Sequence, residues 1–398
     1  MGKKVLYISC EFNHKNGANK SASDVLYSLL LNGYTVEVIS YSSRNNLSSL
    51  LFTSDHINSV KWHRVKRKNI PFNFSVFGFL RYFFRLVESI FYKDTKKIEV
   101  DPDLIIVNSL AGDEIYNQLD SYLKIPSVNI FRGSPESFGI PGVVQTKQDI
   151  VGMLINYNAL IFVSDIVRNK WLKFENLANT LNYYVPNCCE EELILQIKKT
   201  PKPKVREKVF PKMTSKFIIV HLASVQYRKG HDLLLSQMDD LLKNIPNLAL
   251  VFVGDKRSEF AKSMITKYDI TADSPVHFIG EKKDALEYLY AADLLAFPSR
   301  AEAMPRVVIE SMALDTPIVS SDVDGIPELV EHDFSGYLFS LDDTEKMKNE
   351  IIDLYTNAEK RAFFAEKAQE NFQINFSRNA HISNYGRVID QIFSTFKC

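Results

Sequence analysis

Short apolar runs recur along the chain, separated by polar turns and by segments in which apolar residues have helical spacing. The runs in the first half are Lys4–Cys10, Thr35–Ser40, Leu104–Asn108, Ser127–Phe131 and Ala159–Ser164. The runs in the second half are Phe217–Leu222, Ala249–Val253, Val276–Ile279, Leu294–Phe297 and Pro317–Ser320. Runs that are largely apolar, with little alternation, are typical of parallel strands buried on both faces. The pattern predicts an α/β protein built from β-α-β units.

Segments with helical spacing lie between and after these strands. They predict helices at Ser21–Asn32, Gly112–Leu123, Asp165–Lys173, Leu286–Ala292 and Arg306–Leu314, one that begins at His231, and three at the end, Asp343–Asn357, Lys360–Gln373 and Arg378–Phe396. The stretch Glu190–Lys216 is charged and contains Pro201, Pro203 and Pro211, so it predicts a connection between domains. A chain of 398 residues fits two domains of about 150–200 residues each.

Composition and charge exclude several classes of protein. The 48 basic and 48 acidic residues balance, so no overall field attracts nucleic acid or a membrane. The four cysteines have no C-x-x-C spacing, which argues against a metal site or a disulfide framework and favours a reducing compartment. The start, MGKKVLYISCEF, has too short an apolar core for a signal peptide, and no run of 18 apolar residues occurs. We therefore expect a cytoplasmic protein without a transmembrane helix and without a nucleic-acid partner.

The first β-α-β unit resembles a dinucleotide-binding half only in outline. The loop after its first strand, NHKNGANK, holds one glycine, Gly17, and the spacing Gly-x-Gly-x-x-Gly is absent. Those glycines let a backbone approach a pyrophosphate, so their absence argues against an NAD enzyme. A glycine needed only for a turn is the alternative interpretation of Gly17.

The segment from Leu294 to Phe339 carries the strongest candidate chemistry. It has the pattern of a strand, a loop, a helix and a strand, with Glu302 in the loop and Glu310 in the helix. A carboxylate accepts two hydrogen bonds at once, which suits the vicinal hydroxyls of a ribose or a hexose. The alternatives are that Glu310 forms a surface ion pair with Arg306, four residues earlier, and that Glu302 is a solvated loop residue.

The start of the predicted helix in this segment suits a phosphate. A helix N-terminus presents unpaired amides and a partial positive charge. Pro305 fits the first turn because it has no amide to leave unpaired. The candidate amide donors are therefore those of Ala303, Met304 and Arg306.

The residues EAMPRVVIESMALDTPIVSSDVDGIPELV resemble the signature of the family-four glycosyltransferases of the GT-B fold. In that signature two glutamates flank seven residues, and a small-residue helix, a Thr-Pro-hydrophobic strand and a Gly-Ile-Pro-Glu turn follow. Glu302 and Glu310 match the glutamates, and residues 325–328 match the turn. Two positions depart from it: residues 303–305 replace a glycine-rich run, and Asp315 stands where a glycine commonly ends the helix.

The resemblance implies two Rossmann-like domains that face a central cleft, with a C-terminal helix that crosses back to the first domain. The implied boundaries are 1–195 together with 376–398 for the first domain, 196–216 for the connection, and 217–375 for the second domain. Residues Tyr183–Asn187 match the strand that closes the first domain in the family. The donor, a nucleotide diphosphate sugar, is then expected mainly on the second domain and the acceptor mainly on the first.

A phosphate loop at residues 223–230 is also implied by the resemblance. Lys229 precedes a glycine at a helix start and matches the lysine that neutralises charge on the leaving diphosphate. Ser224 stands where a second basic residue is usual, and Arg228 is the candidate to supply that charge.

Further donor contacts are implied at the ends of other strands. Gly280 and Glu281 follow the strand after which the family's backbone meets the nucleotide base, and Gly17 lies in the loop that faces the donor phosphates. Glu310 is expected to hold the ribose hydroxyls. Glu302, together with the amides that follow it, is expected to hold the sugar and to place its anomeric carbon.

The implied reaction retains the anomeric configuration and needs no side chain as nucleophile, so Lys229 and Glu302 are the catalytic candidates. Asp322-Val323-Asp324 spells the Asp-x-Asp with which other glycosyltransferases bind a divalent metal. It lies in the family's turn, however, and we expect no metal and no other cofactor.

Two features point to the acceptor. Arg132 and Glu136 follow the carboxyl end of a predicted strand, where α/β sheets place ligands, and a structural ion pair is the alternative. Residues 60–93 combine eight basic residues with ten aromatic ones, which indicates an amphipathic core helix, an acceptor groove or a membrane-interface helix. Arg81 and Arg85 share one face of such a helix, and we expect peripheral binding to anionic lipid on the inner face of the membrane.

The hypothesis with the most support is a hexosyltransferase-type enzyme that moves a sugar from a nucleotide sugar, such as a UDP-sugar, to a glycan or lipid-linked acceptor in polysaccharide or glycolipid synthesis. One alternative is a GT-B enzyme that epimerises or hydrolyses nucleotide sugars. The other is a non-catalytic protein that binds nucleotide sugars or glycans. A nucleic-acid binder would depend on residues 60–93 alone.

Overall fold

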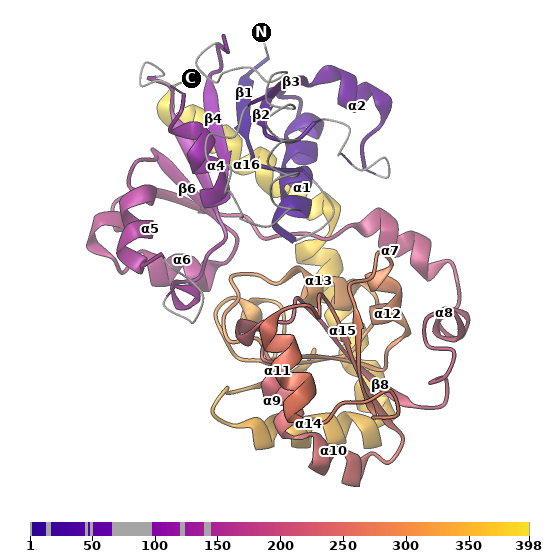
Figure 1. Cartoon of the computed structure of the whole chain (residues 1–398). Helices are drawn as coiled ribbons and strands as arrows, with labels where there is room; N and C mark the ends of the chain where they lie inside the picture. Colours follow the sequence, from indigo (N-terminus) through magenta and orange to yellow (C-terminus); the bar gives the residue numbers. More distant parts are fainter. Residues whose placement is uncertain are drawn as a thin grey trace, which may run out of the picture.

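The computed structural model describes residues 2–12, 17–43, 47, 51–65, 98–119, 124–138 and 145–397. The chain forms two lobes, coloured indigo to magenta and pink to orange in Figure 1, and each lobe is built on one parallel sheet. This arrangement confirms the predicted α/β architecture of two Rossmann-like domains.

The sheet of the first domain has seven strands among the described residues, in the order β3-β2-β1-β4-β5-β6-β7, and neighbouring strands are parallel. They are β1 (Lys4–Ile8), β2 (Thr35–Ser40), β3 (Lys61–Arg64), β4 (Leu104–Asn108), β5 (Ser127–Phe131), β6 (Ala159–Phe162) and β7 (Leu181–Tyr184). Strands β4, β5 and β6 are buried along their whole length, as apolar runs predict. The strand order reverses between β1 and β4, and ligands commonly bind at such a point.

The sheet of the second domain has six described strands in the order β10-β9-β8-β11-β12-β13, again parallel. They are β8 (Phe217–Leu222), β9 (Leu248–Val253), β10 (Val276–Gly280), β11 (Leu294–Phe297), β12 (Ile318–Ser321) and β13 (Tyr337–Phe339). The order reverses here between β8 and β11. The loops after these two strands are those that carry Lys229 and Glu302 in the sequence.

Helices cover the first sheet. In the described part of this domain they are α1 (Gly17–Leu31), α2 (Ser54–Ser59), α4 (Ser109–Tyr116), α5 (Lys147–Leu154) and α6 (Asp165–Trp171). Two predictions were wrong in their limits. α1 begins at Gly17 rather than at Ser21, because the polar residues before Ser21 form its first turn. α4 follows β4 without a loop, since Ser109 turns the chain with a φ of 64°, and it ends at Tyr116.

The helices of the second domain largely follow the predicted pattern. They are α9 (His231–Ser236), α10 (Met238–Asn244), α11 (Glu259–Lys267), α12 (Ala285–Ala291), α13 (Arg306–Ala313), α14 (Thr344–Thr356) and α15 (Ala358–Asn371). A π-helical turn, Phe372–Phe376, then leads from α15 to the last helix, α16 (Arg378–Phe396). Asp315, at the end of α13, has a φ of 53°, so it adopts the left-handed conformation for which glycine is common.

The charged stretch before the second domain contains two helices, α7 (Glu191–Lys198) and α8 (Lys202–Val209). Its prolines do not prevent them, because Pro201 caps α8 and Pro203 lies in the first turn of α8, where no intrahelical amide bond is lost. Both helices pack against α12. This stretch is therefore ordered against the second domain.

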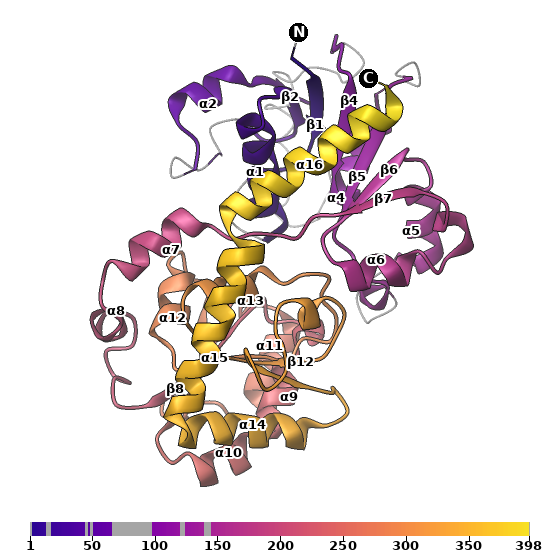
Figure 2. The same cartoon turned by 180° about the vertical axis from the view of Figure 1, so that it is seen from behind.

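The last helix crosses back to the first domain, as expected. Figure 2 shows α16 in yellow running from the second domain along α1. Asn32 donates a hydrogen bond of 2.8 Å to the carbonyl of Ile382, and the Ser28 hydroxyl lies 2.8 Å from His381 Nδ1. Tyr385 and its apolar neighbours on α16 are buried in the core of the first domain.

A buried ion cluster lies where α1, α13 and α16 meet. Asp24 of α1 accepts hydrogen bonds from Arg306 of α13 and from Arg378 at the start of α16. All three residues are buried, and Arg378 also reaches the Cys189 carbonyl at 2.9 Å and Glu192 at 3.2 Å. Burial alone would raise the pKa of Asp24, but the two guanidinium groups outweigh it and hold that pKa well below its usual value.

We predict that Asp24→Asn destabilises the protein by about 3–5 kcal/mol at neutral pH, because it removes the carboxylate that two buried guanidinium groups share. A carboxyl whose pKa is depressed in the folded state stabilises above its unfolded pKa, and that stabilisation is lost as the pH falls. The difference from wild type should therefore narrow below about pH 4.

Chemical denaturation at several pH values measures this difference. Asp101→Asn is the control, because Asp101 pairs with Lys4 at 3.2 Å while its side chain is 95% exposed, and it should change stability by less than about 0.5 kcal/mol. An Asp24→Asn protein as stable as wild type at pH 7 would show that the cluster does not hold the domains together.

Candidate functional site

The candidate site lies at the carboxyl edge of the second sheet, where the strand order reverses. After β8 the chain forms a loop and a 3₁₀ turn, Tyr227–Lys229, before α9. After β11 it forms a loop that contains Glu302 and leads to α13. Because β8 and β11 are neighbours in the sheet, these two loops lie side by side and bring Lys229 to Glu302.

The backbone at Gly230, the residue after Lys229, requires a glycine. Its φ is 71°, in the left-handed region that L side chains rarely adopt. A Cβ added at Gly230 would lie 1.8 Å from the carbonyl oxygen of Pro298, so a larger residue would clash with backbone. The close approach places the preceding turn against the loop after β11 and directs Lys229 toward Glu302.

Glu302 is held by three donors on one carboxylate oxygen. Oε1 accepts hydrogen bonds from Lys229 Nζ, from Arg228 Nη1 at 2.9 Å and from Ser299 Oγ at 2.9 Å. The side chain is only 11% exposed, so the interpretation of Glu302 as a solvated residue is wrong. Within the described residues all these bonds fall on Oε1, which leaves Oε2 for a ligand hydroxyl.

The charges of this group stabilise one another. Burial would raise the pKa of Glu302, but Lys229 and Arg228 outweigh it and lower the pKa below its ordinary value. Burial lowers the pKa of Lys229, and Glu302 opposes that effect. Arg228 thus supplies a second positive charge from the same turn as Lys229, whereas Ser224, exposed in the loop before it, contributes none.

Glu310 and Arg306 are both buried on α13, which excludes a surface ion pair. Arg306 Nε lies 3.9 Å from Glu310 Oε1, and the guanidinium group turns to Asp24 and to Ser21 Oγ on α1, 3.2 Å away. A Cβ added at Gly17 would lie 3.4 Å from Arg306 Cδ. The N-termini of α1 and α13 therefore approach one another, with the amides of both helix starts near the predicted donor.

The loop that joins Glu302 to α13 also contacts the end of the first domain. Asn187 Nδ2 donates a 3.0 Å hydrogen bond to the carbonyl of Met304, and Ala303 and Met304 are buried. Pro305, the N-cap residue of α13, makes no side-chain capping hydrogen bond within the described structure, and the first turn of α13 has no acidic residue. The amides at this helix start are thus arranged as an anion site requires.

The predicted base-binding residues lie on the same edge of the second sheet, beyond β9 and β10. Gly280 has a φ of 79°, and its carbonyl accepts a 3.1 Å hydrogen bond from Gly254. A Cβ on Gly254 would lie 1.8 Å from the Ala223 carbonyl, so this loop packs closely beside Ser224. Glu281 is exposed next to it.

On the first domain, Arg132 and Glu136 do not pair with each other. Arg132 Nη1 donates a 2.6 Å hydrogen bond to Asn108 Oδ1 at the end of β4. Glu136 lies 3.2 Å from Lys170 of α6, and the Ser134 hydroxyl donates to it at 3.0 Å. Both residues follow β5, at the carboxyl edge of the first sheet. They remain acceptor-side predictions.

The sequence suggested Asp324 only as part of a metal motif, and its contacts differ from that interpretation. Its carboxylate accepts a 2.9 Å hydrogen bond from the amide of Glu302 and lies 2.7 Å from Lys170 Nζ. Among the described residues, no group of three or more His, Cys, Asp or Glu side chains is arranged to hold a metal ion.

The sequence analysis did not identify Lys170 and Ser299 as site residues, because lone polar residues in a loop or on a helix carry no spacing signal.

Most of the basic and aromatic stretch at 60–93 lies outside the described residues, including Arg81 and Arg85. Its start is a strand and not a helix, because Lys61–Arg64 forms β3 at the edge of the first sheet. In the part of the chain that the structure describes, no helix is both long enough and apolar enough to cross a membrane.

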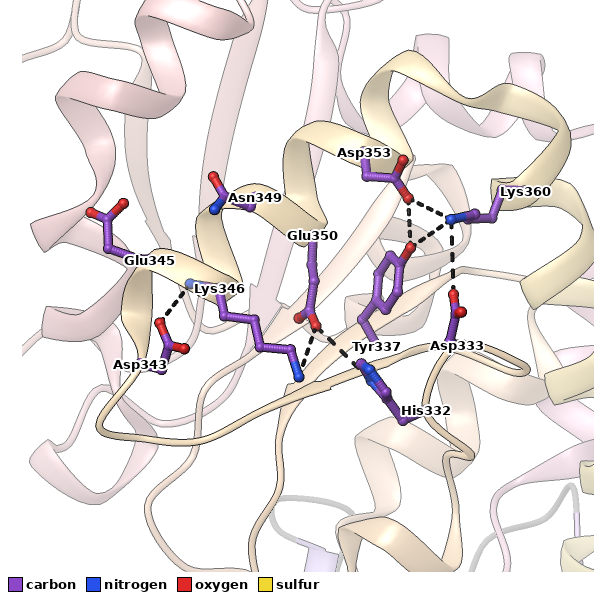
Figure 3. Close-up of a pocket in the computed structure, with 10 residues that line it drawn as sticks. All are labelled: His332, Asp333, Tyr337, Asp343, Glu345, Lys346, Asn349, Glu350, Asp353 and Lys360. Carbon is purple, nitrogen blue, oxygen red and sulfur yellow. Dashed lines mark hydrogen bonds and ion pairs between the residues drawn. The ribbon is translucent and has the colours of Figure 1, made fainter.

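A separate pocket of about 480 Å³ lies between β13 and α14 of the second domain, and it contains none of the predicted site residues. Figure 3 shows Glu350 pointing from α14 toward Lys346 and His332, with separations of 3.7 and 4.0 Å. Both carboxylate oxygens are buried without a hydrogen bond among the described residues. Burial raises the pKa of Glu350 to about 7.

We predict that Glu350→Gln raises the melting temperature by a few degrees at pH 8 and by much less at pH 5. A carboxyl whose folded pKa is raised favours the folded state only while it is protonated, so Glu350 costs stability as the pH rises from about 4.5 to about 7. Glutamine removes that cost. Thermal unfolding at the two pH values measures it, with Glu345→Gln, 65% exposed on the same helix, as the control. An equal change at both pH values would contradict the raised pKa of Glu350.

The second half of the chain is similar in sequence to known glycosyltransferases. Residues 203–371 match the family model of the glycosyl transferases group 1. The chain is 26% identical over 171 residues to the N-acetyl-alpha-D-glucosaminyl L-malate synthase of Bacillus anthracis, which is 43% of this chain and 44% of that protein. It is 32% identical over 143 residues to an uncharacterised glycosyltransferase of Haemophilus influenzae, which is 35% of this chain and 40% of that protein. The chain thus spans less than half the length of these relatives.

Two solved structures share the whole fold. The sucrose-phosphate synthase of Thermosynechococcus elongatus superposes with a TM-score of 0.74 and 18% identity, covering 99% of this chain and 100% of that one. HepE of Anabaena, solved with UDP and glucose, superposes with a TM-score of 0.69 and 20% identity, over 99% and 100% of the two chains. Residues 203–371 thus resemble the group 1 glycosyl transferases, and the two domains have the GT-B fold of these solved structures.

Proposed function

We propose that the protein transfers a sugar from a nucleotide diphosphate sugar to a glycan or lipid-linked acceptor with retention of configuration. The observation that carries the proposal is the buried pair of Lys229 and Glu302 at the reversal point of the second sheet. It lies in the region that matches the glycosyl transferases, which is where a donor site is expected. HepE, with the same fold, was solved with UDP-glucose, and this supports a UDP-sugar as the first donor to test.

The arrangement supplies what a leaving diphosphate requires. Lys229 and Arg228 bring two positive charges to one turn, and the uncapped start of α13 adds unpaired amides. A preorganised donor aimed at developing charge commonly contributes 10²–10³-fold in rate. In the free protein Lys229 is paired with Glu302, so a bound diphosphate competes for that ammonium group and frees part of the carboxylate.

The two glutamates then divide the hydroxyls of the donor. Glu302 Oε2 accepts from the transferred sugar, because Oε1 is already occupied by three donors. Glu310, buried on the next helix, accepts from the ribose, and Arg306 lies 3.9 Å from it. The backbone around Gly280 and Glu281, with the adjoining loop at Ser224, holds the base.

The first domain supplies the acceptor side. Arg132 and Glu136 lie at the carboxyl edge of its sheet, and Glu136 connects to the donor loop through Lys170 and Asp324. We place the protein in the cytoplasm, with peripheral membrane contact through residues 60–93. The composition of that stretch and the use of lipid-linked acceptors by enzymes of this fold support the membrane contact.

We predict that the donor binds and turns over in the purified protein and that Lys229→Ala lowers turnover about 100-fold or more. A thermal-shift screen of nucleotide sugars, UDP-glucose first, identifies the donor, since a ligand at a hundredfold excess over its Kd raises stability by about 2.7 kcal/mol. Release of the nucleoside diphosphate then measures turnover. Lys243→Ala is the control, because Lys243 forms an exposed pair with Asp240 on α10 and should leave turnover unchanged.

Three outcomes separate the candidate functions. Near-normal turnover in Lys229→Ala would remove that lysine from the site. Binding without turnover, with every acceptor supplied, would favour a non-catalytic binding protein. Turnover to free sugar or to an epimer, unaffected by glycan acceptors, would favour a hydrolase or an epimerase.

We also predict that turnover persists in excess chelator, because Lys229, Arg228 and the start of α13 would supply the positive charge that a metal supplies in other glycosyltransferases. Asp324 is already bonded to Lys170 and to the Glu302 amide. The assay with and without chelator tests this. Complete loss of turnover that magnesium or manganese restores would return Asp322 and Asp324 to the role of metal ligands.

A further inference from the structure

The turn at residues 322–328 of the second domain holds helix α6 of the first domain. Glu328 Oε1 accepts a hydrogen bond of 2.5 Å from Ser164 Oγ, which caps α6, and one of 2.8 Å from the amide of Ile166. Asp324 Oδ1 accepts one of 2.7 Å from Lys170, at the other end of α6. Two carboxylates of one turn therefore hold one short helix of the opposite domain.

The turn is built for a close approach between the domains. A Cβ added at Gly325 would lie 2.7 Å from Ser164 Oγ and 1.8 Å from the carbonyl oxygen of Ala303, so only glycine fits between the two domains. Asp324 has a φ of 48°, which is a left-handed conformation that is unfavourable for a residue with a side chain. Contacts on both sides of Asp324 are needed to keep it there.

Asp324 connects Lys170 directly to the candidate donor site. Its second oxygen, Oδ2, accepts a 2.9 Å hydrogen bond from the backbone amide of Glu302, and the Glu302 carbonyl accepts one of 3.1 Å from Gly325. The carboxylate of Asp324 is 1% exposed. A single buried carboxylate thus spans from a lysine of the first domain to the backbone of the residue predicted to hold the sugar.

Lys170 contacts a carboxylate on the donor side and another on the acceptor side. It lies 2.7 Å from Asp324 and 3.2 Å from Glu136, so it bridges a donor-side and an acceptor-side carboxylate. Burial would lower its pKa, but the two acids outweigh burial and raise it. No other described cation lies within ion-pair distance of Asp324 or Glu136, so without Lys170 these two acids have no counter-charge.

We propose that Lys170 is a positioning residue through which closure of the two domains fixes Glu302 for the sugar of the donor. Lys170 acts through Asp324 and does not touch the reacting atoms. When the domains part, Asp324 loses its partner across the interface, and the amide of Glu302 loses a fixed acceptor. Arg228 and Ser299 still hold Oε1 when the diphosphate competes for Lys229, so a shift of this backbone redirects Oε2, the oxygen left for the sugar. This role of Lys170 rests on the proposed function.

The proposal separates recognition of the nucleotide from recognition of the sugar. The nucleoside diphosphate mainly meets Lys229, Glu310 and the strand-end loops of the second domain. The sugar meets Glu302, whose backbone position depends on Lys170 of the first domain. Loss of Lys170 should therefore weaken binding of a sugar nucleotide while leaving the nucleotide's own binding nearly unchanged.

The experiment compares the full-length wild type with Lys170→Met, Lys170→Arg and Arg168→Met. Calorimetry measures affinity for UDP and for UDP-glucose. In Lys170→Met the affinity for UDP-glucose relative to UDP should fall about tenfold, which is the effect of losing one charge-assisted hydrogen bond. Lys170→Arg should restore most of it. Arg168, whose ion pair with Asp165 lies within α6 at 2.6 Å, provides the matched control, and Arg168→Met should match wild type.

A second measurement needs no ligand. Hydrogen exchange of the peptide covering residues 299–304 should be faster in Lys170→Met than in wild type, because the Glu302 amide loses its fixed acceptor, and equal to wild type in Arg168→Met. Unchanged exchange in Lys170→Met, or an unchanged ratio of affinities, would overturn the role of Lys170. Wild type that binds neither UDP nor UDP-glucose would count against the proposed donor, and hydrogen exchange would then decide the role of Lys170 by itself.

Discussion

The relative position of the two domains depends on Asp24, a single carboxylate shared by two arginines. One arginine, Arg306, begins the helix of the donor site, and the other, Arg378, begins the helix that crosses between domains. Each arginine has a second acidic neighbour: Arg306 lies 3.9 Å from Glu310, and Arg378 lies 3.2 Å from Glu192. Negative and positive side chains therefore alternate across the interface. Burying charges is costly unless each has a partner, and this alternation gives Arg306, Asp24 and Arg378 an opposite charge on each side.

These ion pairs also fix the position of the start of α13. Arg306 is anchored to α1 on one side of α13, and the loop before α13 is anchored through Glu302 to the turn that contains Lys229 on the other. The start of α13 can shift only if one of these buried ion pairs separates. A site in which amides and charges must face a diphosphate before it arrives benefits from such a constraint, since little reorganisation remains for the reaction itself.

The parts of this structure that the sequence predicts are those in which local pattern and burial agree. β2, β4, β5, β8 and β11 have the predicted limits because each is an apolar run between polar turns. α7 and α8 were interpreted as a connection because charged residues and prolines dominate them, and only packing on α12 gives them a buried face. The resemblance identified Lys229, Glu302 and Glu310, whose spacing is a family signature. Asp24 and Lys170 have no such spacing, and their partners lie far away in sequence.

The interface holds two kinds of ion pair, and they have different consequences for motion. The Asp24 cluster is enclosed by α1, α13 and α16, with Asp24, Arg306 and Arg378 almost fully buried, so separating it takes both counter-charges from the buried Asp24. Lys170 is 31% exposed, and Glu136 beside it is 45% exposed. Water can therefore replace the contact between Lys170 and Glu136 at much lower cost. If the domains open, this asymmetry places the hinge at Asp24 and the moving edge at Lys170. Glu302, which we propose to hold the sugar, is then tied to the edge that moves, whereas α13, which we propose to face the diphosphate, is tied to the hinge.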